Sequence, residues 1–167
     1  MLILYTGNGK GKTSACIGQA LRAMGHGMTV AFGQFMKRDN QSGEQRVLKR
    51  LLGTLFFVGG EGFFRHEKDR ARHRAAALRT LAWGKNVLSG ADMLVLDETL
   101  YALGAALLTQ EEVANLADAS GARDRHLVLS GRNAPDWLIQ AADIVTEMRE
   151  IKHPCRNGVV AAPGIEF

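Results

Sequence analysis

The sequence predicts an α/β fold in which a mainly parallel sheet is flanked by helices on both faces. Short, near-continuous apolar runs alternate with longer segments of helical periodicity, and such runs are typical of parallel strands that are covered on both sides. The first apolar run leads directly into a glycine-rich turn and then a helical segment, which is the order found around a phosphate-binding loop. Ligands of such sheets bind at the carboxyl ends of the strands.

The first part of the chain supplies a strand, a helix and a second strand. We expect the first strand at residues 2–5 and a helix at 13–24, which the segment Gly25-His26-Gly27 ends. His26 is interpreted as shaping that helix end rather than taking part in chemistry. The second strand is expected at 28–35.

The middle of the chain is predicted to contain two helices around a short strand. Residues 41–52 are expected to be helical, with four apolar residues on one face: Val47, Leu48, Leu51 and Leu52. A strand is expected at 54–58, and the glycine-rich residues 59–62 then open a loop. A long helix follows at 67–88, closed by Gly90.

The last part of the chain continues the alternation. Strands are expected at residues 91–97, 126–130 and 143–148. The segment Thr109-Gln110-Glu111-Glu112 is a capping box, in which Thr109 is the N-cap and Glu112 reaches back. Pro135 starts a short helix to residue 142. The pattern shows no internal repeat and no interdomain linker.

Composition indicates one globular domain over residues 1–167, with 46% hydrophobic and 23% charged residues. No apolar run approaches the ~20 residues of a membrane span, and Met1 leads straight into a strand rather than a signal peptide. Cys16 and Cys155 show no pattern of spacing. We expect both to be reduced thiols of a cytoplasmic protein, with Cys16 packed in its helix.

A net charge of +4 favours anionic ligands. The basic residues concentrate in one stretch: Arg65, Lys68, Arg70, Arg72, Arg74 and Arg79. They form either a nucleic-acid patch or a solvated helix face. We favour the second interpretation, because no aromatic residues interleave with the charges as a single-strand binder needs. Neither a nucleic-acid nor a membrane partner is expected.

The segment Thr6–Ser14 reads TGNGKGKTS and predicts a phosphate-binding loop between strand and helix. Lys12 can reach the outer phosphates and the Thr13 hydroxyl can coordinate Mg²⁺. The common pattern G-x-x-x-x-G-K-[ST] requires glycine where this chain has Thr6, so the loop is one residue short. A glycine-rich turn without a ligand is the alternative interpretation. The shortening suggests a triphosphate held differently from that of an ordinary γ-phosphate hydrolase.

A second motif is the apolar run of residues 93–96 that ends in Asp97 and Glu98. A buried strand delivers both carboxylates to the sheet edge beside the loop, where they can bind Mg²⁺. Alone, the pattern also fits a strand followed by a helix-capping Asp. Glu98 could serve as a base, but nothing marks it as one rather than a metal ligand. The two motifs predict binding of Mg·ATP or Mg·GTP without fixing the reaction.

Further segments, taken together, resemble the phosphate-loop type of ATP:corrinoid adenosyltransferases, over nearly the whole chain from residue 2. The segments are the short loop Gly7-Asn8-Gly9-Lys10-Gly11-Lys12-Thr13, then Arg22-Ala23-Met24-Gly25-His26-Gly27, Gln34-Phe35-Met36-Lys37, Gly43-Glu44, Gly62-Phe63, Leu96-Asp97-Glu98, Ser130-Gly131-Arg132, Ala142-Asp143, Lys152-His153 and Gly164-Ile165-Glu166-Phe167. The resemblance implies that Co(I) of a reduced corrinoid attacks C5′ of ATP, and that triphosphate leaves. The loop, Lys12 and Mg²⁺ then stabilise the leaving group, and the protein orients C5′ against cobalt.

The resemblance also implies roles for individual residues. The triphosphate is cradled by Gly7, Asn8, Gly9, Lys10, Gly11, Lys12, Thr13 and Ser14. Thr13 and Glu98 hold the metal, with Asp97 near it. Arg22 and Arg132 contact the nucleotide phosphates, although a surface helix charge and a loop charge are the simpler interpretations of these two arginines.

Phe63 matches a family aromatic that lies against the lower face of the corrinoid and keeps the lower axial ligand off cobalt. A core or loop phenylalanine is the alternative. The family's next aromatic, two residues later, is replaced by Arg65, and Phe64 is a candidate substitute. Family members often carry an extra N-terminal segment over a neighbouring active site, whereas this sequence begins at the first strand. We therefore expect slower turnover or looser corrinoid binding.

The resemblance implies ATP, Mg²⁺ and a corrinoid as ligands, a homodimer, and a flavoprotein reductant. The main alternative is a RecA-like ATPase or ATP-switched module that acts on nucleic acid or a protein partner, with the basic helix as its support. It predicts steady phosphate release, whereas a small-molecule kinase predicts ADP and the adenosyltransferase predicts triphosphate.

Overall fold

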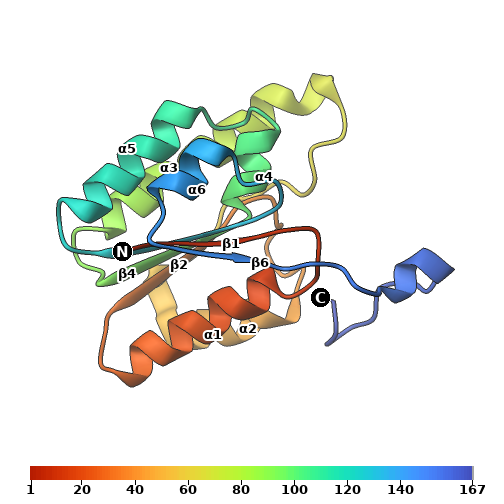
Figure 1. Ribbon diagram of the computed structural model, residues 1–167, viewed down its shortest axis with the longest axis horizontal. Helices are drawn as coiled ribbons and strands as arrows, with labels where there is room; N and C mark the ends of the chain where they lie inside the picture. Colours follow the sequence, from red (N-terminus) through yellow and green to blue (C-terminus); the bar gives the residue numbers. More distant parts are fainter. Residues whose placement is uncertain (167) are drawn as a thin grey trace.

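Six parallel strands form one sheet at the centre of the structure, a computed structural model that describes residues 1–166 apart from the Cys155 side chain (Figure 1). The expected Cys155 thiol and the final Phe167 of the tail motif lie outside the described residues. The strands are β1 (Leu2–Thr6), β2 (Val30–Gln34), β3 (Phe56–Val58), β4 (Met93–Asp97), β5 (His126–Ser130) and β6 (Ile144–Glu147). The α-helices are α1 (Lys12–Gly25), α2 (Gly43–Leu52), α3 (Arg70–Val87), α4 (Thr99–Gly104), α5 (Gln110–Gly121) and α6 (Asp136–Ala141). Three short 3-10 helices are η1 (Gly53–Leu55), η2 (Glu67–Asp69) and η3 (Pro154–Asn157).

The strand order is β3-β2-β4-β5-β1-β6, so β5 separates the strand of the phosphate loop from the strand that ends in Asp97. This is a RecA-like P-loop fold, as the sequence predicts. Because all strands point the same way, the residues that end β1, β2, β4 and β5 gather at one edge of the sheet. Those residues are Thr6, Gln34, Asp97 and Ser130.

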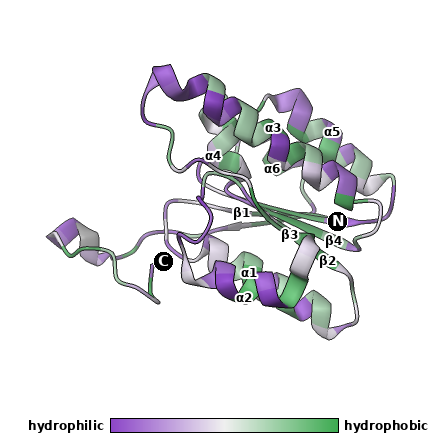
Figure 2. Cartoon of the chain, turned by 180° about the vertical axis from the view of Figure 1, so that it is seen from behind, coloured by the Kyte–Doolittle hydropathy of each residue, from purple (hydrophilic) through white to green (hydrophobic). Residues whose placement is uncertain are grey.

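Helices cover both faces of the sheet: α1 and α2 lie on one side, and α3, α4, α5 and α6 on the other (Figure 1). The core includes Cys16 and Leu48 on the first side, and Leu81, Leu100 and Leu116 on the second. Hydrophobic colouring concentrates along the strands between the two helical layers (Figure 2). Burial raises the pKa of the Cys16 thiol well above its ordinary value, which fits the packing role expected of it. In the described part of the chain, no helix is long and apolar enough to cross a membrane.

The element boundaries follow local chemistry. The backbone N–H of His26 bonds the carbonyl of Ala23 at the end of α1, so His26 shapes the helix end as expected. The capping box of α5 is confirmed, because Thr109 Oγ1 accepts from the Glu112 N–H while Glu112 accepts from the Thr109 N–H. The predicted long helix starts as η2 and continues as α3.

The apolar face expected for α2 is wrong in detail. Leu48 is buried and Leu52 packs against the same core cluster, but Val47 and Leu51 are 45% and 47% exposed. The inward face of α2 carries buried Gln45 instead, whose amide donates to Gln34 Oε1 (3.0 Å). A polar contact with the end of β2 therefore occupies part of the inward face of α2, beside Leu48.

Two further features differ from expectation. The six-residue helix α4 follows β4 immediately, and it is too short for a periodic signal. All of β6 is exposed, although the apolar run predicts cover on both faces. Its position at the sheet edge explains the exposure, because the chain beyond it leads away from the helical layers (Figure 1).

The basic stretch lies on α3 and just before it, and four of its five arginines form ion pairs within the chain. Arg70 bonds Glu67, Arg72 bonds Asp69, and Arg74 forms two short bonds to Glu112. Arg79 lies 3.7 Å from a Glu61 carboxylate oxygen. Ion pairing of this kind supports the solvated helix face over a nucleic-acid patch.

The Arg74–Glu112 pair gives a pH-dependent prediction. Hydrogen bonds from Arg74 are the main cause that lowers the pKa of Glu112 from 4.5 to about 2. A lowered folded-state pKa contributes stability that is present above pH 4.5 and is lost as the pH falls towards 2. We expect Glu112→Gln to lower the free energy of unfolding by roughly 1 kcal/mol at pH 7, a figure discounted for partial exposure. The loss should shrink below pH 4.5.

Urea denaturation at pH 7 and at several values below pH 4.5 measures this difference, with Glu111→Gln as the matched control in the same helix turn. A loss for Glu112→Gln that is equal at every pH would contradict the assignment.

Candidate active site

The phosphate loop joins β1 to α1 in a backbone course that glycine makes possible. Gly7 and Gly11 adopt positive φ values of 96° and 118°, in the region that favours glycine. A Cβ on Gly7 would lie 2.4 Å from the carbonyl oxygen of Met148, and one on Gly9 would lie 2.8 Å from the same oxygen. The Gly9 N–H donates to that carbonyl (2.7 Å). The segment after β6 therefore supports the loop directly.

Lys12 is buried and folds back into its own loop. Its ammonium donates to the carbonyl oxygens of Gly7 and Gly9, at 2.7 Å each. Burial lowers the pKa of Lys12, Arg132 acts in the same direction, and Glu98 and Asp97 oppose the shift. The Lys12 ammonium is thus held against the carbonyl groups of the loop, where the N-terminus of α1 adds its positive dipole end.

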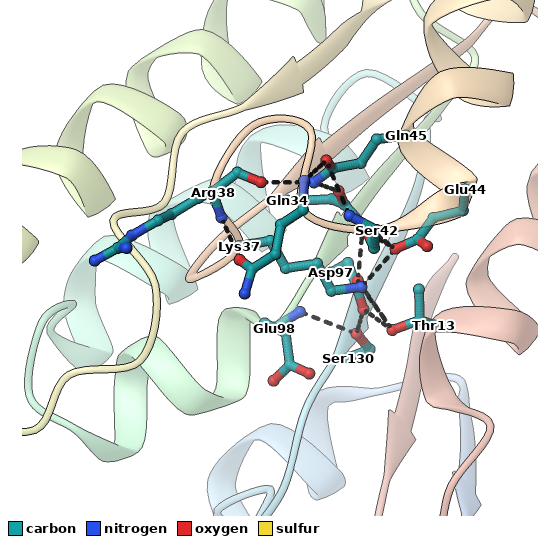
Figure 3. A network of polar contacts seen from close by, with 11 residues as sticks. Thr13, Gln34, Lys37, Arg38, Ser42, Glu44, Gln45, Asp97, Glu98 and Ser130 are labelled. Atoms are coloured by element: carbon teal, nitrogen blue, oxygen red, sulfur yellow. Dashed lines mark hydrogen bonds and ion pairs between the residues drawn. The ribbon is translucent and has the colours of Figure 1, made fainter. Parts of the chain in front are cut away.

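Asp97 is the hub of the site and is 0% exposed. Thr13 Oγ1 donates to its carboxylate at 3.1 and 3.2 Å, and Ser130 Oγ donates at 2.7 Å. Gln34 Nε2 donates at 3.3 Å, and the Lys37 ammonium lies 3.2 Å away. Figure 3 shows these partners converging on Asp97 from separate elements. The structure therefore brings Thr13 and Asp97 together, as the metal hypothesis requires.

Glu98 is placed differently from its neighbour. It caps α4 with a positive φ of 63°, a conformation that is strained for a residue with a side chain. Its N–H donates to Ser130 Oγ (3.1 Å), and its carboxylate points away from Asp97 (Figure 3). Burial and then the charge of Asp97 raise the pKa of Glu98, while Lys37, Lys12 and Arg132 oppose the rise. The two adjacent acids consequently face different parts of the site.

Lys37 and Glu44 are members of the site to which the sequence gave no role. The Lys37 ammonium donates to Glu44 Oε1 (2.8 Å) and to Thr13 Oγ1 (3.3 Å), in addition to its contact with Asp97. Burial acts to raise the pKa of Glu44, but hydrogen bonds from Lys37 and Ser42 and the charge of Lys37 outweigh it and hold the pKa at about 2. Both residues lie within segments quoted for the family resemblance, and that was their only signal.

Of the two arginines predicted to contact the nucleotide phosphates, one lies near the phosphate loop and the other lies far from it. Arg132 follows β5 and lies close enough to Lys12 and Glu98 to shift both pKa values. Arg22 lies in the last turn of α1, about 15 Å along the helix axis from Lys12 at 1.5 Å per residue. The structure therefore does not bring Arg22 to the loop within one chain. Asn8, Lys10 and Ser14 are exposed around the loop and α1.

Phe63 lies outside this network, beside a hollow of about 350 Å³. It is 59% exposed and packs edge-on against Tyr101, with ring centroids 5.7 Å apart. Arg65 also lines the hollow. The Phe64 ring packs against His73 beneath the Arg70 guanidinium, so its role as a substitute for the missing aromatic stays a prediction.

Gly7 yields a prediction about the loop. We expect Gly7→Ala to lower stability by about 2 kcal/mol or more, because the positive φ is strained for alanine and the new methyl group meets Met148. ATP affinity should fall with it. The matched control is Gly18→Ala within α1, where a Cβ meets nothing within 4 Å. There we expect a gain of up to ~1 kcal/mol.

Urea denaturation and titration with a fluorescent ATP analogue check both variants. A Gly7→Ala protein with normal nucleotide affinity would show that the loop tolerates displacement from Met148.

A family model described as ATP:corrinoid adenosyltransferase BtuR/CobO/CobP matches residues 1–167. A protein named corrinoid adenosyltransferase from Sinorhizobium sp is 38% identical over 171 residues, covering 100% of this chain and 80% of that protein. One from Pseudomonas aeruginosa is 38% identical, covering 100% and 83%. Corrinoid adenosyltransferase CobA of Salmonella typhimurium is 37% identical, covering 100% and 85%.

Among solved structures, AMPPCP-bound DnaA from Aquifex aeolicus is similar at 16% identity, with a TM-score of 0.47. The match covers 88% of this chain and 39% of that chain.

Proposed function

The chain belongs to the ATP:corrinoid adenosyltransferase family, and from that premise we propose how its site performs the reaction. The family resemblance stated from the sequence is confirmed. The enzyme transfers the 5′-deoxyadenosyl group of ATP to Co(I) of a reduced corrinoid. In the proposal, the cobalt–carbon bond forms as the C5′–oxygen bond breaks, and the electron pair of that bond leaves with triphosphate.

The observation that carries the proposal is the arrangement of Lys12 and Thr13 on one shortened glycine loop, beside buried Asp97. The loop N–H groups and Lys12 neutralise the charge that develops on the departing triphosphate. Because the nucleophile is the corrinoid itself, the protein has no water to activate. Its task is to hold C5′ in line with cobalt and to receive the leaving group.

We propose Mg²⁺ as the metal of this site. The Thr13 hydroxyl and the Asp97 carboxylate lie 3.1 Å apart, and hard oxygen donors of this kind suit a Mg²⁺ ion that takes its other ligands from phosphate and water. When bound, the ion supplies Lewis-acid stabilisation of the triphosphate. Glu98 is the third proposed ligand. Its carboxylate points away from Asp97 (Figure 3), so it would reach the ion from another side or through one of the ion's waters.

The corrinoid is proposed to lie against Phe63. An exposed aromatic ring beside a hollow is suited to contact a large planar ligand. Arg65 at the rim replaces the second aromatic of the family pattern, so Phe63 alone would keep the lower axial ligand off cobalt. Arg132 is proposed to contact the triphosphate, and the same role for Arg22 stays a prediction. A flavoprotein reductant, a homodimeric assembly and a cytoplasmic setting complete the proposal.

An anaerobic assay tests the reaction itself. The protein is mixed with Mg·ATP, cob(II)alamin and a strong reductant, and visible absorbance and phosphate products are followed. We expect loss of the Co(I) spectrum, a light-sensitive alkylcobalt product and one triphosphate per corrinoid. Persistence of Co(I) while ADP and phosphate accumulate would instead support the ATP-switched alternative.

The role of Phe63 can be separated from general damage. We expect Phe63→Ala to lower kcat with cob(II)alamin about ten-fold or more, whereas a corrinoid without a lower nitrogenous base should be affected much less. ATP affinity should not change, and stability should fall by about 1 kcal/mol at most, because Phe63 is 59% exposed and loses only the edge-on contact with Tyr101 described above. Val47→Ala, an exposed apolar residue on α2, is the control. Equal losses with both corrinoids would rule out the lower-face role.

A further inference from the structure

The Lys37 ammonium occupies the position at which a cation of this site is expected. It lies 2.8 Å from Glu44 Oε1, 3.2 Å from Asp97 Oδ2 and 3.3 Å from Thr13 Oγ1 (Figure 3). Thr13 and Asp97 are the same two groups that the proposed function assigns to Mg²⁺. A positive charge carried by the chain and a metal ion would therefore compete for the same oxygen atoms.

The placement of Lys37 is built into the backbone. The preceding residue, Met36, has a positive φ of 59°, and the Lys37 N–H bonds the Phe35 carbonyl at 2.6 Å. Gly60 packs against this turn so closely that a Cβ there would lie 2.4 Å from the Met36 backbone. The side chain of Lys37 is only 22% exposed. Such constraints distinguish it from a surface lysine that samples many partners.

The two carboxylates that contact the Lys37 ammonium are also held in place by hydrogen bonds and burial. Ser42 Oγ donates to Glu44 Oε1 (2.6 Å), and Gln34 Nε2 donates to the same oxygen (3.2 Å). Ser42 is also the N-cap of α2 and part of its capping box. Asp97 is fully buried, and an uncompensated carboxylate at such a position is strongly destabilising. Two carboxylates thus share one ammonium in a rigid pocket.

We propose that the Lys37 ammonium occupies the metal-binding position while nucleotide is absent, and that it leaves this position when metal and triphosphate bind together. The inference rests on the metal and nucleotide site proposed above. Bare divalent metal then binds weakly, because it must displace an ammonium from Asp97 and Thr13 without gaining phosphate ligands. With triphosphate present, the phosphate oxygens coordinate the metal, and this offsets the cost of displacing the ammonium. They also give the freed ammonium a new anionic partner. Metal binding is therefore coupled to nucleotide binding through Lys37.

Mn²⁺ is the probe, and its free concentration is measured by electron paramagnetic resonance with wild type and Lys37→Met. Without nucleotide, we expect the variant to bind Mn²⁺ about ten-fold more tightly or better. The ratio of Mn²⁺ affinities measured with and without a non-reacting ATP analogue should shrink by a similar factor. Lys37→Arg keeps the charge and should keep weak metal binding. Lys49→Met, which removes an α2 lysine paired with Asp39, should change nothing.

The test remains decisive if Lys37→Met is unstable. In that case millimolar Mg²⁺ without nucleotide should raise its melting temperature by several degrees, whereas NaCl of equal ionic strength should not. A variant that binds Mn²⁺ no more tightly than wild type, or that Mg²⁺ fails to stabilise, overturns the inference. The anaerobic assay tests the proposed function separately. Tighter Mn²⁺ binding by Lys37→Met, in a protein without transferase activity, would support competition between Lys37 and the metal while contradicting the proposed function.

Discussion

The arrangement at the carboxyl edge of the sheet depends on one buried carboxylate, that of Asp97, and on the donors that surround it. A fully buried carboxylate is stable only where donors surround it. Its donors come from α1, β2, β5 and the turn after β2, through Thr13, Gln34, Ser130 and Lys37. Elements that are distant in the sequence are thereby fixed relative to one another at the point where the ligand is proposed to bind.

The strand order makes this convergence possible. Because β5 lies between β1 and β4, the phosphate loop and Asp97 are separated by the width of one strand. Ser130 fills the gap, since its hydroxyl donates to Asp97 and accepts the Glu98 N–H. The same hydroxyl thus orients both acids and directs them to different parts of the site. An adjacent pairing of β1 and β4 would leave no place for it.

Sequence reasoning was most successful where a short segment carries its own signal. The loop at residues 7–13, the capping box of α5 and the acid at the end of β4 were all predictable, because turn chemistry, capping and apolar runs act locally. Lys37 and Glu44 could not be assigned from pattern, since their partners lie on other elements and only tertiary packing brings them together. The same cause misled the prediction for α2, where contact between Gln45 and Gln34 overrides apolar periodicity. Phe64 was likewise engaged by residues of α3 that its own neighbourhood does not reveal.

The two lysines of the site, Lys12 and Lys37, already have partners within the chain, and this shapes how binding energy can be used. Lys12 is satisfied by loop carbonyls, and Lys37 by two carboxylates. In the proposed site, triphosphate would exchange partners with these two lysines rather than fill a set of free charges, so its net affinity would be the difference between two satisfied states. Such an exchange would favour turnover, because the loop carbonyls and Asp97 would again bind the two ammonium groups as the product departs. A site of bare cations would hold a polyanionic product more tightly, and release would then limit the rate.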